Sequence, residues 1–278
     1  MSIHNLVRSE STKLFTSKAT WIVAGATILL TWPMAFTNAG AYNLPLDDPR
    51  LFSSEPTPPE FQGFEVADFG YVLVVVLAAL WGGSEYGNGH QIHTTFAATP
   101  QRGSVFLVKA AILAILVGIV AFLTILGAIM ITHSVSESGI DPWRLPAQVW
   151  AHIGGLTLAW VLTALMSFAL GTLGRTAILP LLVITPLIVG LNVFIADFWE
   201  GARYLPITAG AAMYSDPAAE WHLGAFTGGM TQAAWALVLL LAAATRMPIE
   251  AHGFETAGFG QPIVILIAAL LAGTRCAR

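Results

Sequence analysis

Few residues of this sequence could do chemistry, and none of them forms a set that would catalyse a reaction. His90 and His93 stand at helical spacing and could share a metal ion, but no third ligand lies nearby, so we expect no metal site. The sequence contains no G-x-x-x-x-G-K-S/T phosphate loop, no H-E-x-x-H zinc motif and no G-x-S-x-G nucleophile motif. Cys276 is the single cysteine and cannot form an internal disulfide. We therefore expect that the chain is not an enzyme and holds no cofactor of its own.

Two side-chain amides and two prolines lie inside long apolar runs. Asn192 and Gln232 could face a translocation pathway, or they could make interhelical hydrogen bonds worth about 0.6 kcal/mol each. Pro180 and Pro186 leave backbone carbonyls unpaired and predict a kink, which could act as a gate or be static. No pair of acidic residues lies in the middle of a run, as a proton relay would require, and this disfavours a secondary transporter.

The elements that must position these residues are membrane-spanning helices. The chain of 278 residues is 56% hydrophobic and only 10% charged, against roughly 25% charged in a soluble domain, so lipid must solvate part of it. A bilayer core about 30 Å thick needs about 20 helical residues. Five of six charge-free stretches are long enough, and the second can cross only if its outer end lies among the headgroups. The six stretches are residues 19–46, 69–84, 110–136, 145–174, 176–196 and 221–245.

The basic residues predict the orientation of these spans. With six crossings and a cytoplasmic N-terminus, seven Lys and Arg residues fall inside and three fall outside, which agrees with the positive-inside rule. We therefore expect an all-α integral protein of the cell (plasma) membrane with six transmembrane helices. The inner set is Arg8, Lys13, Lys18, Arg102, Lys109, Arg175 and Arg246, and the outer set is Arg50, Arg144 and Arg203.

The two ends of the chain are expected to differ from the spans. Residues 3–18 predict an amphipathic helix along the inner interface, with apolar residues on one side that Glu10 interrupts. Residues 1–247 form one six-span domain. In the segment 248–278, residues 256–274 could be a seventh span, an interfacial segment or a frayed tail, and we favour a segment that does not span.

The inner loop between the second and third spans has an ordered set of polar residues. Glu85 follows the second span, Gly89 and Thr95 lie within the loop, Pro100-Gln101-Arg102 closes it, and Lys109 opens the next span. This loop resembles the cytoplasmic signature of type-2 permease subunits of ABC transporters. Glu10-Ser11-Thr12-Lys13-Leu14 is similar to the opening of the same family, a Glu-x-x-Lys-Leu just before the first span. The likeness extends over residues 1 to about 247.

The resemblance implies a function. The chain would be the permease subunit of an ATP-driven exporter, with the substrate pathway between it and a second permease copy or homologue. Separate ABC ATPase subunits would hold ATP and Mg²⁺ and would push the loop, where residues 94–98 could form a short helix that Pro100 ends. Glu85 and Arg102 would contact the ATPase, and Glu10 and Lys13 would meet it from the N-terminal helix.

Simpler interpretations of the same residues remain open. Glu85 could form a local ion pair, and Arg102 and Lys109 could only anchor the chain to lipid phosphates. The whole chain could be an ATP-independent secondary transporter or channel, or a structural membrane subunit without a pathway. No basic stripe is present to bind nucleic acid.

Overall fold

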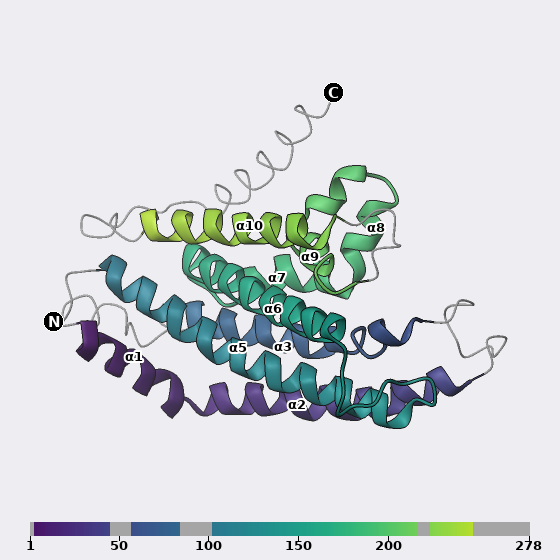
Figure 1. Ribbon diagram of the computed structural model, residues 1–278. Helices are drawn as coiled ribbons and strands as arrows, with labels where there is room; N and C mark the ends of the chain where they lie inside the picture. The colour runs from purple at the N-terminus through teal and green to yellow at the C-terminus, as the bar shows by residue number, and fades with distance from the viewer. Residues whose placement is uncertain (1–2, 45–56, 84–101, 216–222, 247–278) are drawn as a thin grey trace.

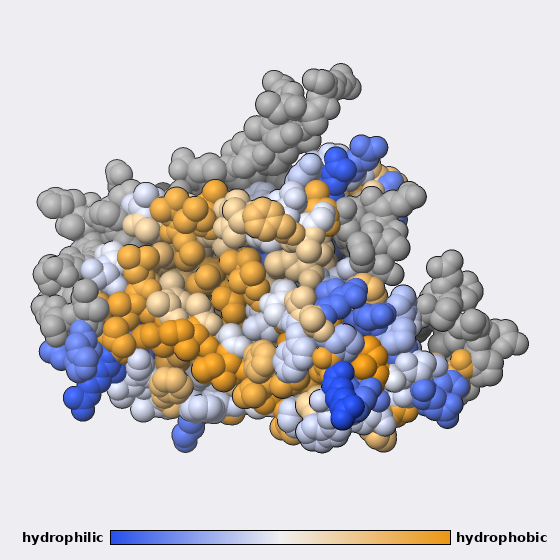
Figure 2. All heavy atoms as spheres, in the orientation of Figure 1, coloured by the Kyte–Doolittle hydropathy of each residue, from blue (hydrophilic) through white to orange (hydrophobic). Residues whose placement is uncertain are grey.

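Long runs without charged side chains form long helices in this protein. A computed structural model describes residues 3–44, 57–83, 102–215 and 223–246, of which 84% are helical and none lie in a strand (Figure 1). Within these ranges, five helical stretches are long and apolar enough to cross a bilayer, and hydrophobic residues cover much of the middle of the visible face (Figure 2). The prediction of an all-helical membrane protein is confirmed at this level. The six crossings and the cytoplasmic N-terminus stay predictions.

The helices lie side by side, and the short helix α1 slants along one end of the bundle (Figure 1). Where the structure describes the connections between them, these are turns and short helical segments. In chain order the elements are α1 (Ile3–Thr16), α2 (Lys18–Ala39), η1 (Gly40–Asn43), η2 (Pro59–Phe61), α3 (Ala67–Gly83), α5 (Arg102–Val135), α6 (Ala147–Gly174), α7 (Ile178–Pro186), η4 (Leu187–Leu191), α8 (Asn192–Ala196), η5 (Glu200–Tyr204), α9 (Pro206–Ala211) and α10 (Ala225–Arg246).

The short helix α3 lies at the centre of the bundle. It packs against α2, α5, α6 and α7, and Tyr71, Val75 and Ala78 on it are buried. Its 17 residues rise only about 25 Å. Because protein rather than lipid surrounds it, α3 does not need the length of a lipid-exposed span.

Helix α2 packs through a face of small side chains. Threonine and alanine at helical spacing lie against α3 and α5, which lets the backbones approach closely. Thr27 and Thr31 donate their hydroxyl protons to carbonyls one turn earlier, so burial leaves these hydroxyls paired. The opposite face exposes Ile22 and Leu29, as a lipid-facing surface does.

Helix α5 begins earlier than the sequence predicts. We expected the third span to start at residue 110 with Lys109 at its edge, but α5 begins at Arg102 and Lys109 lies inside it. Lys109 is only 4% exposed. The prediction was wrong because a buried lysine that is paired with a carboxylate does not end a helix.

The fifth span is broken in its second half. Pro186 ends α7, the π-helical segment η4 follows, and Gly190 within it has φ +125°. Only glycine adopts that backbone conformation at low cost. Pro180 lies in the first turn of α7, where its missing N–H removes no helical hydrogen bond. The predicted kink therefore forms at Pro186 to Gly190 and not at Pro180.

The short helix α9 is folded into the bundle. It lies between the charge-free runs 176–196 and 221–245, where the sequence predicts no span, yet it is mostly buried and packs against α6 and α10. Gly228 on α10 makes this contact possible, because a methyl group there would collide with the carbonyl of Ala209. A methyl group on Gly155 of α6 would likewise collide with the carbonyl of Met213.

Candidate functional site

The N-terminal helix α1 packs on α5 through one face. Leu6, Glu10 and Leu14 follow one another at four-residue intervals and are all buried. Glu10 therefore lies on the face of α1 that packs on α5, and only 1% of it is exposed. A carboxylate in this position requires a cation or strong hydrogen-bond donors beside it.

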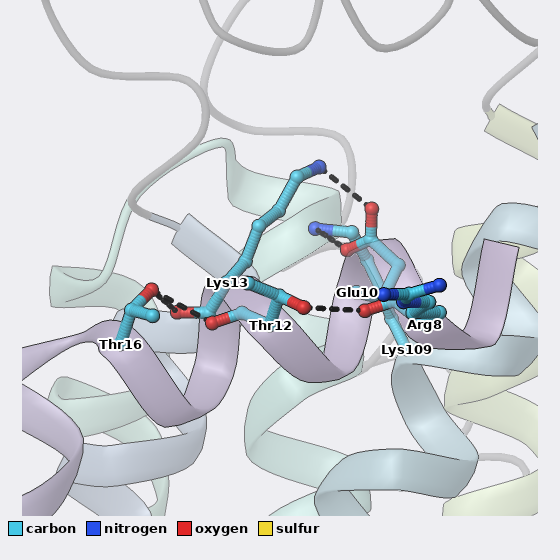
Figure 3. A network of polar contacts seen from close by, with 6 residues as sticks. All are labelled: Arg8, Glu10, Thr12, Lys13, Thr16 and Lys109. Carbon is cyan, nitrogen blue, oxygen red and sulfur yellow. Dashed lines mark hydrogen bonds and ion pairs between the residues drawn. The ribbon is translucent and has the colours of Figure 1, made fainter. Parts of the chain in front are cut away.

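Two lysines from different helices supply the compensating charge (Figure 3). Lys13, one turn along α1, donates from its Nζ to Glu10 Oε1 at 2.6 Å. Lys109 of α5 places its Nζ 3.3 Å from Glu10 Oε2. The same ammonium lies 4.7 Å from the centroid of the Trp81 ring on α3, close enough for a cation–π contact. We call Glu10, Lys13, Lys109 and Trp81 the basal junction.

The basal junction joins three elements at one end of the bundle. Trp81 lies in the last turn of α3, and Lys109 lies in the third turn of α5. The segment 84–101 connects these two helices. Glu10 of α1 pairs with Lys109 of α5, and Lys109 in turn contacts the Trp81 ring of α3. None of the four side chains is arranged for covalent chemistry. Their arrangement can transmit a displacement, because a buried ion pair resists separation.

The structure brings together residues that the sequence analysis had assigned to two sites. Glu10 and Lys13 were expected at an N-terminal interface and Lys109 at the coupling loop, yet all three form one junction. Glu85, Gly89, Thr95 and Pro100 lie outside the described residues, as do residues 94–98 and 256–274. Arg102 is the first residue of α5.

Trp81 was missed as a member of the junction. The sequence did carry a signal for the pairing of Glu10 with Lys109. Glu10 is one acid on an apolar helix face and Lys109 is one lysine beside an apolar run, and each requires a partner.

A second polar cluster lies inside the bundle. Gln232 of α10 is fully buried, and its Nε2 donates to Thr163 Oγ1 at 3.0 Å and to the carbonyl of Ala159 at 3.3 Å. Tyr71 of α3 donates its hydroxyl to the same carbonyl at 3.1 Å and lies 2.7 Å from Thr163 Oγ1. Trp160 stacks on the Tyr71 ring. These bonds connect α3, α6 and α10.

The interhelical interpretation of Gln232 fits these contacts, and a pathway role stays a prediction. The sequence analysis missed Tyr71 and Thr163, although a tyrosine in the middle of an apolar helix is itself a signal for a buried partner. Asn192, the other amide, is the first residue of α8 and is buried beside the helix break. No hydrogen bond joins the two amides in the described part of the chain.

The two ends of the bundle carry opposite charge. The end with α1 holds Arg8, Lys13, Lys18, Lys109 and Arg175, and α5 begins and α10 ends with an arginine there (Figure 1). Described acidic residues concentrate at the other end, where Arg144 and Arg203 are also found. This is the distribution from which the cytoplasmic position of α1 is predicted. The acidic residues of that end are Glu60, Glu65, Glu137, Asp141, Asp197 and Glu200.

Comparisons with protein-family models, with curated proteins and with solved structures find no match to this chain.

Proposed function

We propose that this chain is the membrane-spanning permease subunit of an ATP-driven ABC exporter. It would work in the cell membrane as a dimer with a second permease copy or homologue, coupled to separate ATPase subunits that hold ATP and Mg²⁺. The substrate pathway would lie between the two permeases, and the N-terminus would be cytoplasmic.

The basal junction is the observation that carries this proposal. The likeness to type-2 permeases rests on two segments far apart in the sequence, Glu10 to Leu14 and the loop that ends near Lys109. Glu10 and Lys109 form an ion pair at one end of the bundle. A subunit that receives force from outside needs its contact segments joined to the spans at one face, and this arrangement supplies such a connection.

The coupling route follows from the contacts of the helices that border the loop. A push on residues 84–101 would act on α3 and α5, and the basal junction would move α1 with them. From α3, the Tyr71, Thr163 and Gln232 hydrogen bonds would carry the displacement to α6 and α10. The spans would then rearrange around the pathway between the two permeases.

The test is assembly with an ATPase. The chain is co-expressed with a candidate ABC ATPase, and the complex is purified and reconstituted in proteoliposomes. We expect stable co-purification and an ATPase rate that differs from that of the ATPase alone. Glu85→Ala should weaken both, whereas Glu137→Ala, an exposed glutamate at the other end, should not. Unchanged assembly and ATPase activity in Glu85→Ala would remove the coupling role.

The broken fifth span favours a second candidate function. Interrupted helices line the binding sites of many secondary transporters, and here buried Asn192 directly follows the break at Gly190. An ATP-independent transporter would show flux driven by an ion gradient in proteoliposomes of the chain alone. Asn192→Leu would abolish that flux, and the ATPase-coupled exporter predicts no such flux.

A further inference from the structure

The side of α1 that faces away from α5 combines apolar and polar residues in a fixed order. Val7 and Phe15 are 40% and 48% exposed, and Arg8, Thr12 and Thr16 are exposed as well. At 3.6 residues per turn, Arg8 lies about 20° around the helix from Phe15 and about 40° from Thr12 on the other side. Arg8 therefore stands at the boundary between an apolar strip and a hydroxyl-rich strip.

The exposed surface of α1 is cationic because its acid is buried. Glu10 is the one carboxylate in Ile3–Thr16, and Lys13 and Lys109 neutralise it inside the basal junction. No ion pair joins Arg8 to Glu10 (Figure 3), and among the described residues no carboxylate pairs with Arg8 or with exposed Lys18. These two cations therefore face outward without a described anion.

An exposed aromatic pair lies at the junction of α1 and α2. The rings of Phe15 and Trp21 are 5.9 Å apart, and Trp21 is 54% exposed. Trp21 Nε1 donates to the carbonyl of Phe15 at 2.8 Å, which fixes the ring beside the end of α1. Aromatic rings with a polar edge favour the level of the lipid headgroups.

We propose that α1 and the start of α2 bind the phosphate groups of anionic phospholipids, with Arg8 and Lys18 as the ligands. Phe15 and Trp21 enter the boundary between headgroups and acyl chains, and this places both cations at the level of the phosphates. The partner is an anionic lipid surface, because the cations of the site match lipid phosphates and its apolar rings match the adjacent acyl chains. This inference does not depend on coupling to an ATPase.

The test measures lipid contact at Trp21 itself. The full chain is reconstituted in phosphatidylcholine vesicles that contain either brominated phosphatidylglycerol or brominated phosphatidylcholine at equal mole fraction. The Trp21 signal is the difference in fluorescence between the wild-type chain and Trp21→Phe. We expect stronger quenching by the anionic lipid. Its relative affinity should fall about fivefold for each cation removed in Arg8→Gln and Lys18→Gln, whereas Arg8→Lys should keep the preference.

Two controls separate this site from general attraction. Arg144→Gln removes an exposed cation at the other end of the bundle and should leave Trp21 quenching unchanged. Added inorganic phosphate at constant ionic strength should not displace the lipid, because it lacks the acyl chains that Phe15 and Trp21 contact. Equal quenching of Trp21 by both lipids, an equal loss in Arg144→Gln, or displacement by phosphate would overturn the proposal.

Discussion

Glu10 offers the sharpest test of the basal junction, since its carboxylate contacts two lysines while only 1% of the residue is exposed. Glu10→Gln keeps the shape and removes the charge, so Lys109 stays buried without that carboxylate. Removing one member of a buried ion pair costs about 3–5 kcal/mol. We therefore expect Glu10→Gln to lower the free energy of unfolding by about 3 kcal/mol.

The two lysines should contribute unequally. Lys109 is nearly buried, with 5% of its side chain exposed, whereas 37% of the Lys13 side chain is exposed. Water screens the Lys13 pair, and such exposed pairs contribute about 0.2–1 kcal/mol. Lys13→Gln should therefore cost much less than Lys109→Met.

The assay is a double-mutant cycle on Glu10→Gln and Lys109→Met in mixed micelles, with unfolding by dodecyl sulfate followed by tryptophan fluorescence. Contacting residues show interaction energies of about 0.5–3 kcal/mol, so the double variant should lose clearly less than both single losses together. Glu137→Gln, an exposed glutamate at the other end, should change the stability by less than about 0.5 kcal/mol. Additivity of the two single changes within about 0.3 kcal/mol would refute the reasoning.

Three further predictions use the same unfolding assay. Gln232→Leu removes the hydrogen bonds to Thr163 and Ala159, and should cost about 0.6–1.7 kcal/mol; no loss of stability would show that these bonds do not hold α10 to α6. Gly228→Leu collides with the carbonyl of Ala209 and should lower the free energy of unfolding by about 1–3 kcal/mol. Gly224→Ala meets open space and should be nearly neutral, so equal losses of stability in the two variants would contradict the close packing of α9. Gly190→Ala forces alanine to φ +125° and should lower the free energy of unfolding by about 1–3 kcal/mol. Gly25→Ala, in a regular helix with open space around it, should not destabilise the protein. A neutral Gly190→Ala would mean that the strained backbone is not required.

Runs without charged residues predict the bounds of several apolar helices well. Helix α6 ends at Gly174 as predicted, and α3 and α10 match their charge-free runs to within a few residues. The rule failed at Lys109, because it treats every charge as solvated. A lysine that a carboxylate and an indole ring enclose can remain inside a helix.

Tertiary contacts explain what the sequence patterns miss. Pro206 lies outside the charge-free runs, but proline is favoured at the first position of a helix and here it begins α9. That α9 is buried depends on small residues in α6 and α10, which no local pattern reveals. Likewise, Glu10 interrupts the apolar side of α1, and only the position of α5 shows that Lys109 meets it.

The enclosed position of α3 has a consequence for synthesis of the chain. Tyr71 and Thr163, whose hydroxyls contact each other, are 92 positions apart. At about 5–20 residues per second, a ribosome needs roughly 5–20 s to make the intervening chain. During that interval the newly made α3 has neither α6 around it nor the hydroxyl partner of Tyr71. The order of synthesis therefore leaves the apolar helix α3 complete but without its main packing partner until the chain behind it arrives.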